Sequence, residues 1–221
     1  MTARPHPPRL IAVSPGTLVP ARVDAFADAA AGAVAAGLRG VLLREPGLAD
    51  GAFLALARRL AALLRPAAGW LAVHDRVHLA TAAKAQAAHV GFRSLPLAEA
   101  RVVLGEDLAL GFSSHAVDDA DTWRGADYLF FGPVFDTPSK RGVVEPTGTA
   151  LLRECVASTE LPVVAIGGLA PEHAAEILAT GAAGMAVLGG VFGANDPAAA
   201  ARAYLAAIAA AEAAGVERVE P

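Results

Sequence analysis

Two pairs of adjacent glycines, Gly167-Gly168 and Gly189-Gly190, each directly follow a short apolar run. Glycine carries no side chain, so its backbone N–H groups can approach an anion closely. Glycine pairs can also do no more than permit tight turns. Because two pairs stand at corresponding places, we expect all four glycines to form a cradle for a phosphate group.

A lysine marks a second candidate for anion binding. The chain has 18 lysines and arginines, and only Lys84 and Lys140 are lysines. A sequence that uses arginine for nearly all its positive charge keeps lysine in the loop Thr137-Pro138-Ser139-Lys140. This favours a compact charge aimed at a phosphate oxygen over a random surface lysine. We therefore expect Lys140 to contact the ligand.

Three further residues suit proton transfer or cation binding. His74 and Asp75 end one apolar run, and His115 ends another. Histidine titrates near neutral pH, so His74 and His115 are candidate bases; the alternatives are a pocket-lining residue and a structural hydrogen bond. Asp75 is a candidate for binding a substrate amine or Mg²⁺, unless it only caps the helix that follows.

Arg44, Arg93 and Ser113 also follow apolar runs and are expected to bind substrate or anion. The alternative for Arg44 is an ion pair with Glu45 or Asp75.

The elements that must position these residues alternate strictly along the chain. The expected strands are Leu10–Val13, Gly40–Leu43, Trp70–Val73, His89–Gly91, Ala109–Ser113, Tyr128–Gly132, Leu161–Ile166 and Met185–Leu188. The expected helices are Val23–Ala36, Phe53–Leu64, Val77–Ala85, Leu97–Leu104, Val117–Trp123, Thr149–Val156, Pro171–Leu178 and Pro197–Ala211.

Eight such repeats predict a single-domain (β/α)8 TIM barrel over residues 1–221, with loose tails at about 1–9 and 213–221. A doubly wound sheet would instead want G-x-G-x-x-G after the first strand, where the chain has Ser14-Pro15-Gly16. In a barrel the active site lies at the C-terminal ends of the strands, and phosphate sites often use the loops after strands seven and eight. Every candidate residue lies in one of these places.

Composition excludes several classes of protein. The chain of 221 residues is 55% hydrophobic, but its longest uncharged run, residues 177–195, holds five glycines and does not suit a membrane span. With a net charge of −4 and no basic run longer than two residues, no nucleic-acid partner is expected. The single cysteine, Cys155, fits a reducing compartment, so we expect a cytoplasmic protein. The Ala-rich helix faces suit a homo-oligomer.

Several motifs carry a resemblance to a known family. Residues 125–140 resemble the G-A-D-Y…G-P-x-F-x-T-x-[ST]-K signature of the thiamine phosphate synthase family. Further matches are Val164–Gly168 to A-I-G-G, His74–Val77 to N-D-R-V, Ser113–His115 to S-T-H, and Leu42–Pro46 to Q-x-R-E-K. The similar TenI-type thiazole tautomerases share the fold and much of this pattern.

The resemblance implies two half-sites. One, with Thr137, Ser139 and the glycine pairs, would hold the phosphate of a thiazole, and it is intact. The other would hold an aminopyrimidine diphosphate and Mg²⁺, and it differs from the family pattern. Leu42 replaces a glutamine, Pro46 a lysine and His74 an asparagine of the family pattern. In the loop after the fourth strand, Phe92 replaces a second glutamine, and Ser94 replaces one of the two aspartates that bind Mg²⁺. Arg44, Asp75, Ser113 and Lys140 remain.

These departures set the order of the functional hypotheses. We expect a thiamine-pathway enzyme that binds thiazole phosphate or thiamine phosphate, and we prefer a TenI-like tautomerase or salvage role. The alternative is a synthase that condenses hydroxymethylpyrimidine diphosphate with thiazole phosphate and uses Mg²⁺, a cofactor the other roles would not need. A second alternative is a non-catalytic thiamine-phosphate-binding protein. Against the preference, TenI-type proteins have a histidine where this chain has Pro133.

Overall fold

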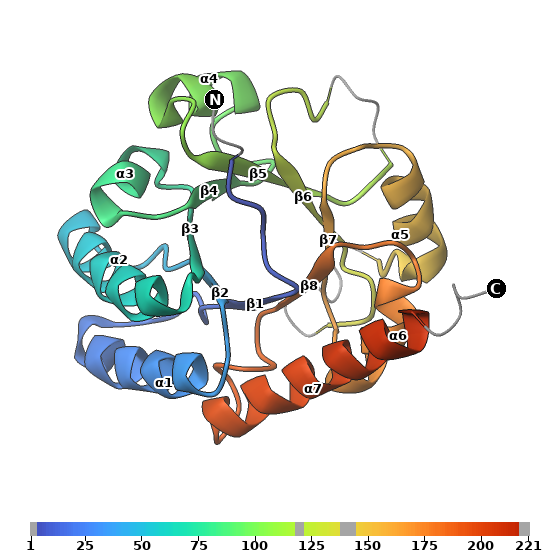
Figure 1. Ribbon diagram of the computed structural model, residues 1–221. Helices are drawn as coiled ribbons and strands as arrows, with labels where there is room; N and C mark the ends of the chain where they lie inside the picture. Colours follow the sequence, from blue (N-terminus) through green and yellow to red (C-terminus); the bar gives the residue numbers. More distant parts are fainter. Residues whose placement is uncertain (1–3, 118–121, 138–144, 217–221) are drawn as a thin grey trace.

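Eight short parallel strands follow one another around a closed barrel, with β8 paired to β1 (Figure 1). The computed structural model describes residues 4–117, 122–137 and 145–216. The strands are β1 (Leu10–Val13), β2 (Gly40–Leu43), β3 (Trp70–His74), β4 (Ala87–Val90), β5 (Ala109–Ser114), β6 (Tyr128–Phe131), β7 (Val163–Ile166) and β8 (Gly184–Val187). The (β/α)8 barrel expected from the sequence is confirmed.

Helices surround the barrel in Figure 1 and cover the outer face of the sheet. They are α1 (Val23–Ala35), α2 (Asp50–Leu64), α3 (Ala80–Ala83), α4 (Leu97–Leu104), α5 (Gly148–Ala157), α6 (Ala174–Leu178) and α7 (Pro197–Val216). Helix α2 shows why they cover it: Phe53, Leu56 and Leu60 share one buried face, while Arg58 and Arg59 point to solvent.

Alternation along each strand divides the core into two layers. In β1, Leu10 and Ala12 belong to the layer between sheet and helices, while Ile11 and Val13 belong to the barrel interior. The interior combines large aromatic side chains with small ones so that they fit together; its members are Ile11, Val13, Leu42, Trp70, Ala72, Ala87, Ala109, Tyr128, Phe130, Val164 and Ala186.

One expected helix falls largely on residues that the structure does not describe. Of the segment Val117–Trp123, residues 118–121 lie outside the described part of the chain, and the residues on either side form bends and turns. Trp123 is buried and its carbonyl accepts the N–H of Ala126 at 3.0 Å. Gly125, with φ of 93°, completes this turn, which leads directly into β6. The described end of the expected helix is therefore a turn anchored by a buried tryptophan.

The described residues of the two expected tails either make contacts with the barrel or belong to a helix. Arg4 pairs with Glu106 and with Asp127, and Arg9 Nε lies 2.7 Å from Glu212 Oε1 on α7. Residues 4–9 thus cross one end of the barrel (Figure 1). Helix α7 continues to residue 216, well beyond the expected end at 211, because its Ala-rich sequence has high helix propensity. Residues 1–3 and 217–221 lie outside the described residues.

Two smaller differences concern β4 and the uncharged run. β4 begins two residues earlier than expected and ends before Gly91, whose N–H donates to Ser94 Oγ at 2.7 Å. Residues 177–195 form the end of α6, β8 and the loop after it. Within the described ranges, no helix is both long and apolar enough to cross a membrane.

Candidate active site

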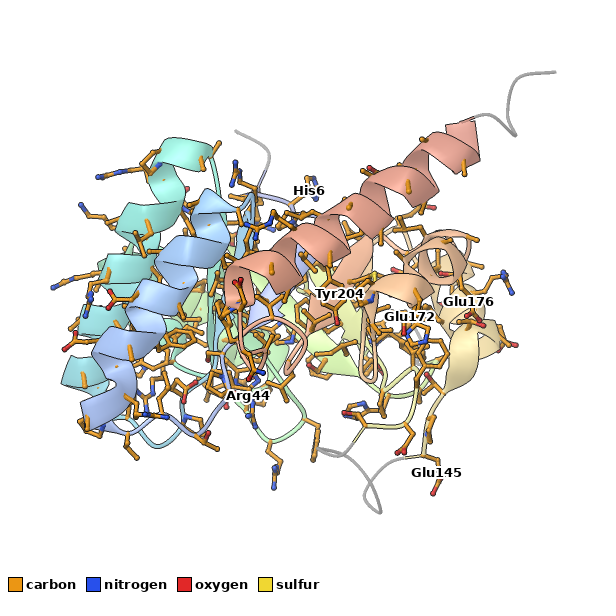
Figure 2. All side chains as sticks on the ribbon, turned by 90° about the horizontal axis from the view of Figure 1, so that it is seen from below. His6, Arg44, Glu145, Glu172, Glu176 and Tyr204 are labelled. Atoms are coloured by element: carbon orange, nitrogen blue, oxygen red, sulfur yellow. The ribbon has the colours of Figure 1, made fainter. Side chains whose placement is uncertain are left out.

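A pocket of about 580 Å³ opens at the C-terminal ends of the strands, a volume typical of small-molecule sites. Figure 2 shows Arg44 and Glu145 at this end of the barrel and His6 at the opposite end. All expected site residues that the structure describes line the pocket: Arg44, His74, Asp75, Arg93, Ser113, His115, Thr137, Gly167, Gly168, Gly189 and Gly190. Ser139 and Lys140 lie outside the described residues.

The glycines after β7 leave no room for side chains. Gly167 and Gly168 have φ of 98° and 67°, a left-handed region that other residues rarely adopt. A Cβ on Gly167 would lie 2.5 Å from Pro133, and one on Gly168 would lie 2.6 Å from the carbonyl oxygen of Asp136. The backbones of the loops after β6 and β7 therefore meet directly at the pocket wall.

The glycines after β8 differ from each other. A Cβ on Gly190 would lie 2.8 Å from Cζ of Tyr204, a buried side chain of α7. The Tyr204 hydroxyl donates to the carbonyl of Leu169 at 2.8 Å, so one side chain holds the loops after β7 and β8 together (Figure 2 labels Tyr204). A Cβ on Gly189 would meet nothing within 4 Å, which leaves this backbone open to a ligand.

The opposite wall carries the ionisable residues, because β3 and β4 lie across the barrel from β7 and β8. Asp75 has φ of 61°, which turns its carboxylate back toward His74. His74 Nδ1 lies 3.0 Å from one carboxylate oxygen, and the Ser94 hydroxyl donates to the other. Asp75 does not cap the following helix, which has no side-chain cap.

This environment keeps Asp75 ionised. Burial alone would raise the pKa of Asp75, but the hydrogen bonds from His74 and Ser94 outweigh it. Electrostatic interactions with His74 and Arg44 act in the same direction, and together these effects lower the pKa of Asp75 to about 2. The pocket therefore presents a carboxylate at any physiological pH.

The adjacent residues Arg44 and Glu45 have different roles. The buried carboxylate of Glu45 accepts the N–H groups of Gly16 and Leu18, each at 2.8 Å, and so fixes the loop after β1. In the described part of the chain, no ion pair forms between Arg44 and Glu45 or Asp75. The Arg44 guanidinium is consequently available at the pocket wall.

His89 lines the pocket although it was not among the expected site residues. This side chain is 1% exposed, and its Nε2 lies 2.8 Å from the hydroxyl of Ser113, while Nδ1 lies 3.2 Å from the Tyr128 hydroxyl. Burial, together with the charge of His74, lowers the pKa of His89, so the ring stays neutral. A buried histidine on a strand of small residues was the signal that could have revealed this contact with the pocket.

His115 and Phe92 stand at the rim. Nδ1 of His115 donates to the carbonyl of Gly132, which orients the ring. Nε2 takes no part in this hydrogen bond. Phe92 and Arg93 follow β4 and line the pocket mouth. The sequence marked Phe92 and Ser94 only as departures from the family pattern, and the contacts they make depend on how the loops meet.

Few described side chains of the pocket could bind a metal ion. The described residues contain no group of three or more His, Cys, Asp or Glu side chains that could hold a metal ion. Among the pocket-lining residues, Asp75 is the one carboxylate. Mg²⁺ commonly binds through one or two carboxylates, with substrate phosphates and water completing its shell. Asp75 therefore fits Mg²⁺ brought in by a diphosphate, and does not fit a metal held by protein alone.

A closed parallel barrel with its pocket at the carboxyl ends of the strands defines the class of (β/α)8-barrel enzymes. Comparison with known proteins narrows the class. The profile of a family described as thiamine monophosphate synthase matches residues 10–191. The chain belongs to this family.

Known relatives agree with the family match. A thiamine-phosphate synthase from Moorella thermoacetica is 40% identical over 173 residues, covering 77% of this chain and 82% of that protein. The thiamine biosynthesis bifunctional protein ThiM/ThiE from Symbiobacterium thermophilum is 44% identical over 172 residues. Those residues are 77% of this chain but only 36% of that longer protein.

A solved structure, the thiamine phosphate pyrophosphorylase from Pyrococcus furiosus, is 27% identical, covers 92% of this chain and 96% of its own, and has a TM-score of 0.81. The resemblance expected from the sequence is thus confirmed. The preference for a TenI-like tautomerase is not confirmed, because the matched family is described as thiamine monophosphate synthase and the Moorella relative is named a thiamine-phosphate synthase, which favours the alternative.

Proposed function

We propose that the protein is a thiamine phosphate synthase, which joins hydroxymethylpyrimidine diphosphate to thiazole phosphate and releases pyrophosphate. The observation that carries this proposal is a pocket with two unlike walls. Glycine backbone lines the side of β7 and β8, and an ionised Asp75 with Arg44 and Arg93 lines the other. Two substrates would fit between such walls with their phosphate groups at opposite sides and their reacting rings in the middle of the pocket.

The chemistry of the condensation assigns a task to each wall. The thiazole ring nitrogen attacks the pyrimidine methylene carbon with its lone pair, and the carbon–oxygen bond to the diphosphate breaks. The electron pair of that bond leaves with pyrophosphate, and the new thiazolium ring carries the positive charge. Mg²⁺, when bound, neutralises charge on the leaving diphosphate. Arg44, Arg93 and Lys140 are proposed to stabilise the same charge.

No proton needs to move in this step, which changes the proposed roles of the histidines. His74 is bonded to Asp75, and His115 is bonded to the Gly132 carbonyl. Both act as positioning residues in this proposal instead of the bases expected from the sequence. Pro133, where a tautomerase of this fold has histidine, packs against Gly167 and offers no base. These contacts support the condensation over a proton-transfer reaction.

The test combines the purified chain with both substrates and Mg²⁺, and follows thiamine phosphate and pyrophosphate by mass spectrometry. We expect the two products in equal amounts and none after a chelator is added. Asp75→Asn should lower kcat/KM by at least about tenfold if the carboxylate helps to hold the metal. Isomerisation of thiazole phosphate without condensation would instead establish the tautomerase interpretation.

A cytoplasmic location and a homo-oligomeric state stay predictions.

A further inference from the structure

The loop after β4 presents an aromatic ring to the pocket without covering it. Phe92 lines the pocket, yet 66% of the residue is exposed. Its ring lies 5.4 Å from the guanidinium carbon of Arg93 and 6.0 Å from the ring of His115, to which it is inclined at 70°. These contacts place the ring at the rim, and most of its surface stays open. An exposed aromatic side chain held in this way suits stacking with a flat ligand.

The position of Phe92 in the barrel indicates which ligand it meets. β4 lies opposite β8 in the closed sheet, so Phe92 and Arg93 face the glycines after β7 and β8 across the pocket. A thiazole whose phosphate lies against those glycines would extend its ring toward the centre of the pocket. The second substrate must then approach from the side of β4.

The charge of the same loop suits an anion. Where the family pattern has an acidic residue, Ser94 accepts the N–H of Gly91 at 2.7 Å and donates to Asp75. The serine hydroxyl is thereby committed within the protein. Arg93 is exposed beside it, and in the described residues no carboxylate pairs with its guanidinium. A guanidinium in this state is well suited to phosphate oxygens, which it can bind through two parallel hydrogen bonds.

We propose that Phe92 and Arg93 form the binding surface for the pyrimidine diphosphate, with the pyrimidine ring stacked on Phe92 and the diphosphate held by Arg93. The identity of this ligand rests on the proposed synthase function. Direct contact by Arg93 would supply positive charge to the diphosphate at the place where, in the family pattern, a second carboxylate helps to hold the neutralising Mg²⁺. The ring and the guanidinium then recognise separate parts of one substrate.

Equilibrium binding separates the two contacts without turnover. Calorimetry with three single probes, the hydroxymethylpyrimidine alcohol, inorganic pyrophosphate with Mg²⁺, and thiazole phosphate, compares the wild-type chain with two variants. Phe92→Ala should weaken binding of the pyrimidine about tenfold and leave pyrophosphate within twofold. Arg93→Ala should weaken pyrophosphate about tenfold and leave the pyrimidine within twofold. Phe92→Tyr should retain pyrimidine binding, because it keeps the aromatic face.

Two matched controls test for damage to the fold. Leu95→Ala removes an exposed apolar side chain of the same loop outside the pocket lining, and Arg153→Ala removes a charge on α5. Both should leave all three affinities within twofold. The proposal is overturned if the wild-type chain does not bind the pyrimidine, if Phe92→Ala leaves that affinity unchanged, or if both variants weaken thiazole phosphate equally. A chain with this binding pattern but no condensation would refute the proposed function alone.

Discussion

Replacing Gly190 with alanine tests whether Tyr204 joins the two glycine loops of the pocket. The added Cβ would lie inside van der Waals contact of the tyrosine hydroxyl, 2.8 Å from Cζ and 3.0 Å from Cε2. Tyr204 has little freedom to move, because it is 3% exposed and its hydroxyl is bonded to Leu169. Either the tyrosine ring or the loop after β8 must therefore shift.

The expected magnitude follows from overpacking in a dense core. Such substitutions typically cost about 1–3 kcal/mol of unfolding free energy. In a protein of this size each kcal/mol lowers Tm by about 2–4 °C, so Gly190→Ala should lower Tm by roughly 2–12 °C. If the shifted loop loses one backbone hydrogen bond to the phosphate, affinity for thiazole phosphate should fall by roughly tenfold or more.

Thermal unfolding and calorimetry measure both effects, and two further variants separate their causes. Gly189→Ala is the matched control, since its Cβ would meet nothing within 4 Å, and it should leave Tm unchanged within about 1 °C. Tyr204→Phe removes the hydroxyl that the new Cβ meets most closely. Gly190→Ala should therefore cost at least about 0.5 kcal/mol less in the Tyr204→Phe background than in the wild-type chain. Additive costs, or equal damage at Gly189, would refute the steric reasoning.

Other features give sharper tests of single contacts. Because the pKa of Asp75 is lowered from 3.8 to about 2, its carboxylate stabilises the fold above about pH 4 and loses this effect as pH falls toward 2. The stability difference between the wild-type chain and Asp75→Asn should be constant at neutral pH and shrink over that acid range in chemical unfolding. Glu45→Gln should lower the free energy of unfolding by about 1–3 kcal/mol, because the amide nitrogen cannot accept a backbone N–H, whereas exposed Glu99→Gln should change it by less than about 0.5 kcal/mol. Gly111→Ala, whose Cβ would overlap Tyr128 and His89, should yield little folded protein, as judged by circular dichroism.

Much of the fold could be predicted because its strands are buried on both faces. Runs such as Val163–Ile166 are continuously apolar and lie between glycine or proline positions, so their limits are visible in sequence. The connection between β5 and β6 was harder to predict. A helix was expected over 117–123, but the described residues 122–125 form a turn in which Trp123 is buried. Residue type alone does not distinguish a tryptophan of a helix from one that anchors a turn.

The site could be predicted as a set of positions but not as a set of contacts. The rule that barrel strands end at the active site correctly placed Asp75, Arg44 and the glycine pairs in the pocket. The contact between His89 and Ser113 depends on the register of β4 against β5, which pairs His89 with Gly111. The bond from Ser94 to Asp75 depends on the left-handed backbone at Asp75. Neither the strand register nor the backbone conformation of Asp75 can be predicted from residue types alone.

This difference between positions and contacts explains why the sequence ranked the tautomerase first, although the comparisons support the synthase better. Compared with the family pattern, Ser94 removes one negative charge and Pro46 removes one positive charge, so these two losses cancel in the net charge of the half-site. Ser94 also stays in the site as a hydrogen-bond donor that keeps Asp75 ionised. Arg93 adds a cation at the rim. The half-site therefore differs from the family pattern in residue identity, but it keeps an ionised carboxylate and positive charge. These are the features that the proposed release of pyrophosphate requires, and they are the physical reason to favour the synthase reaction.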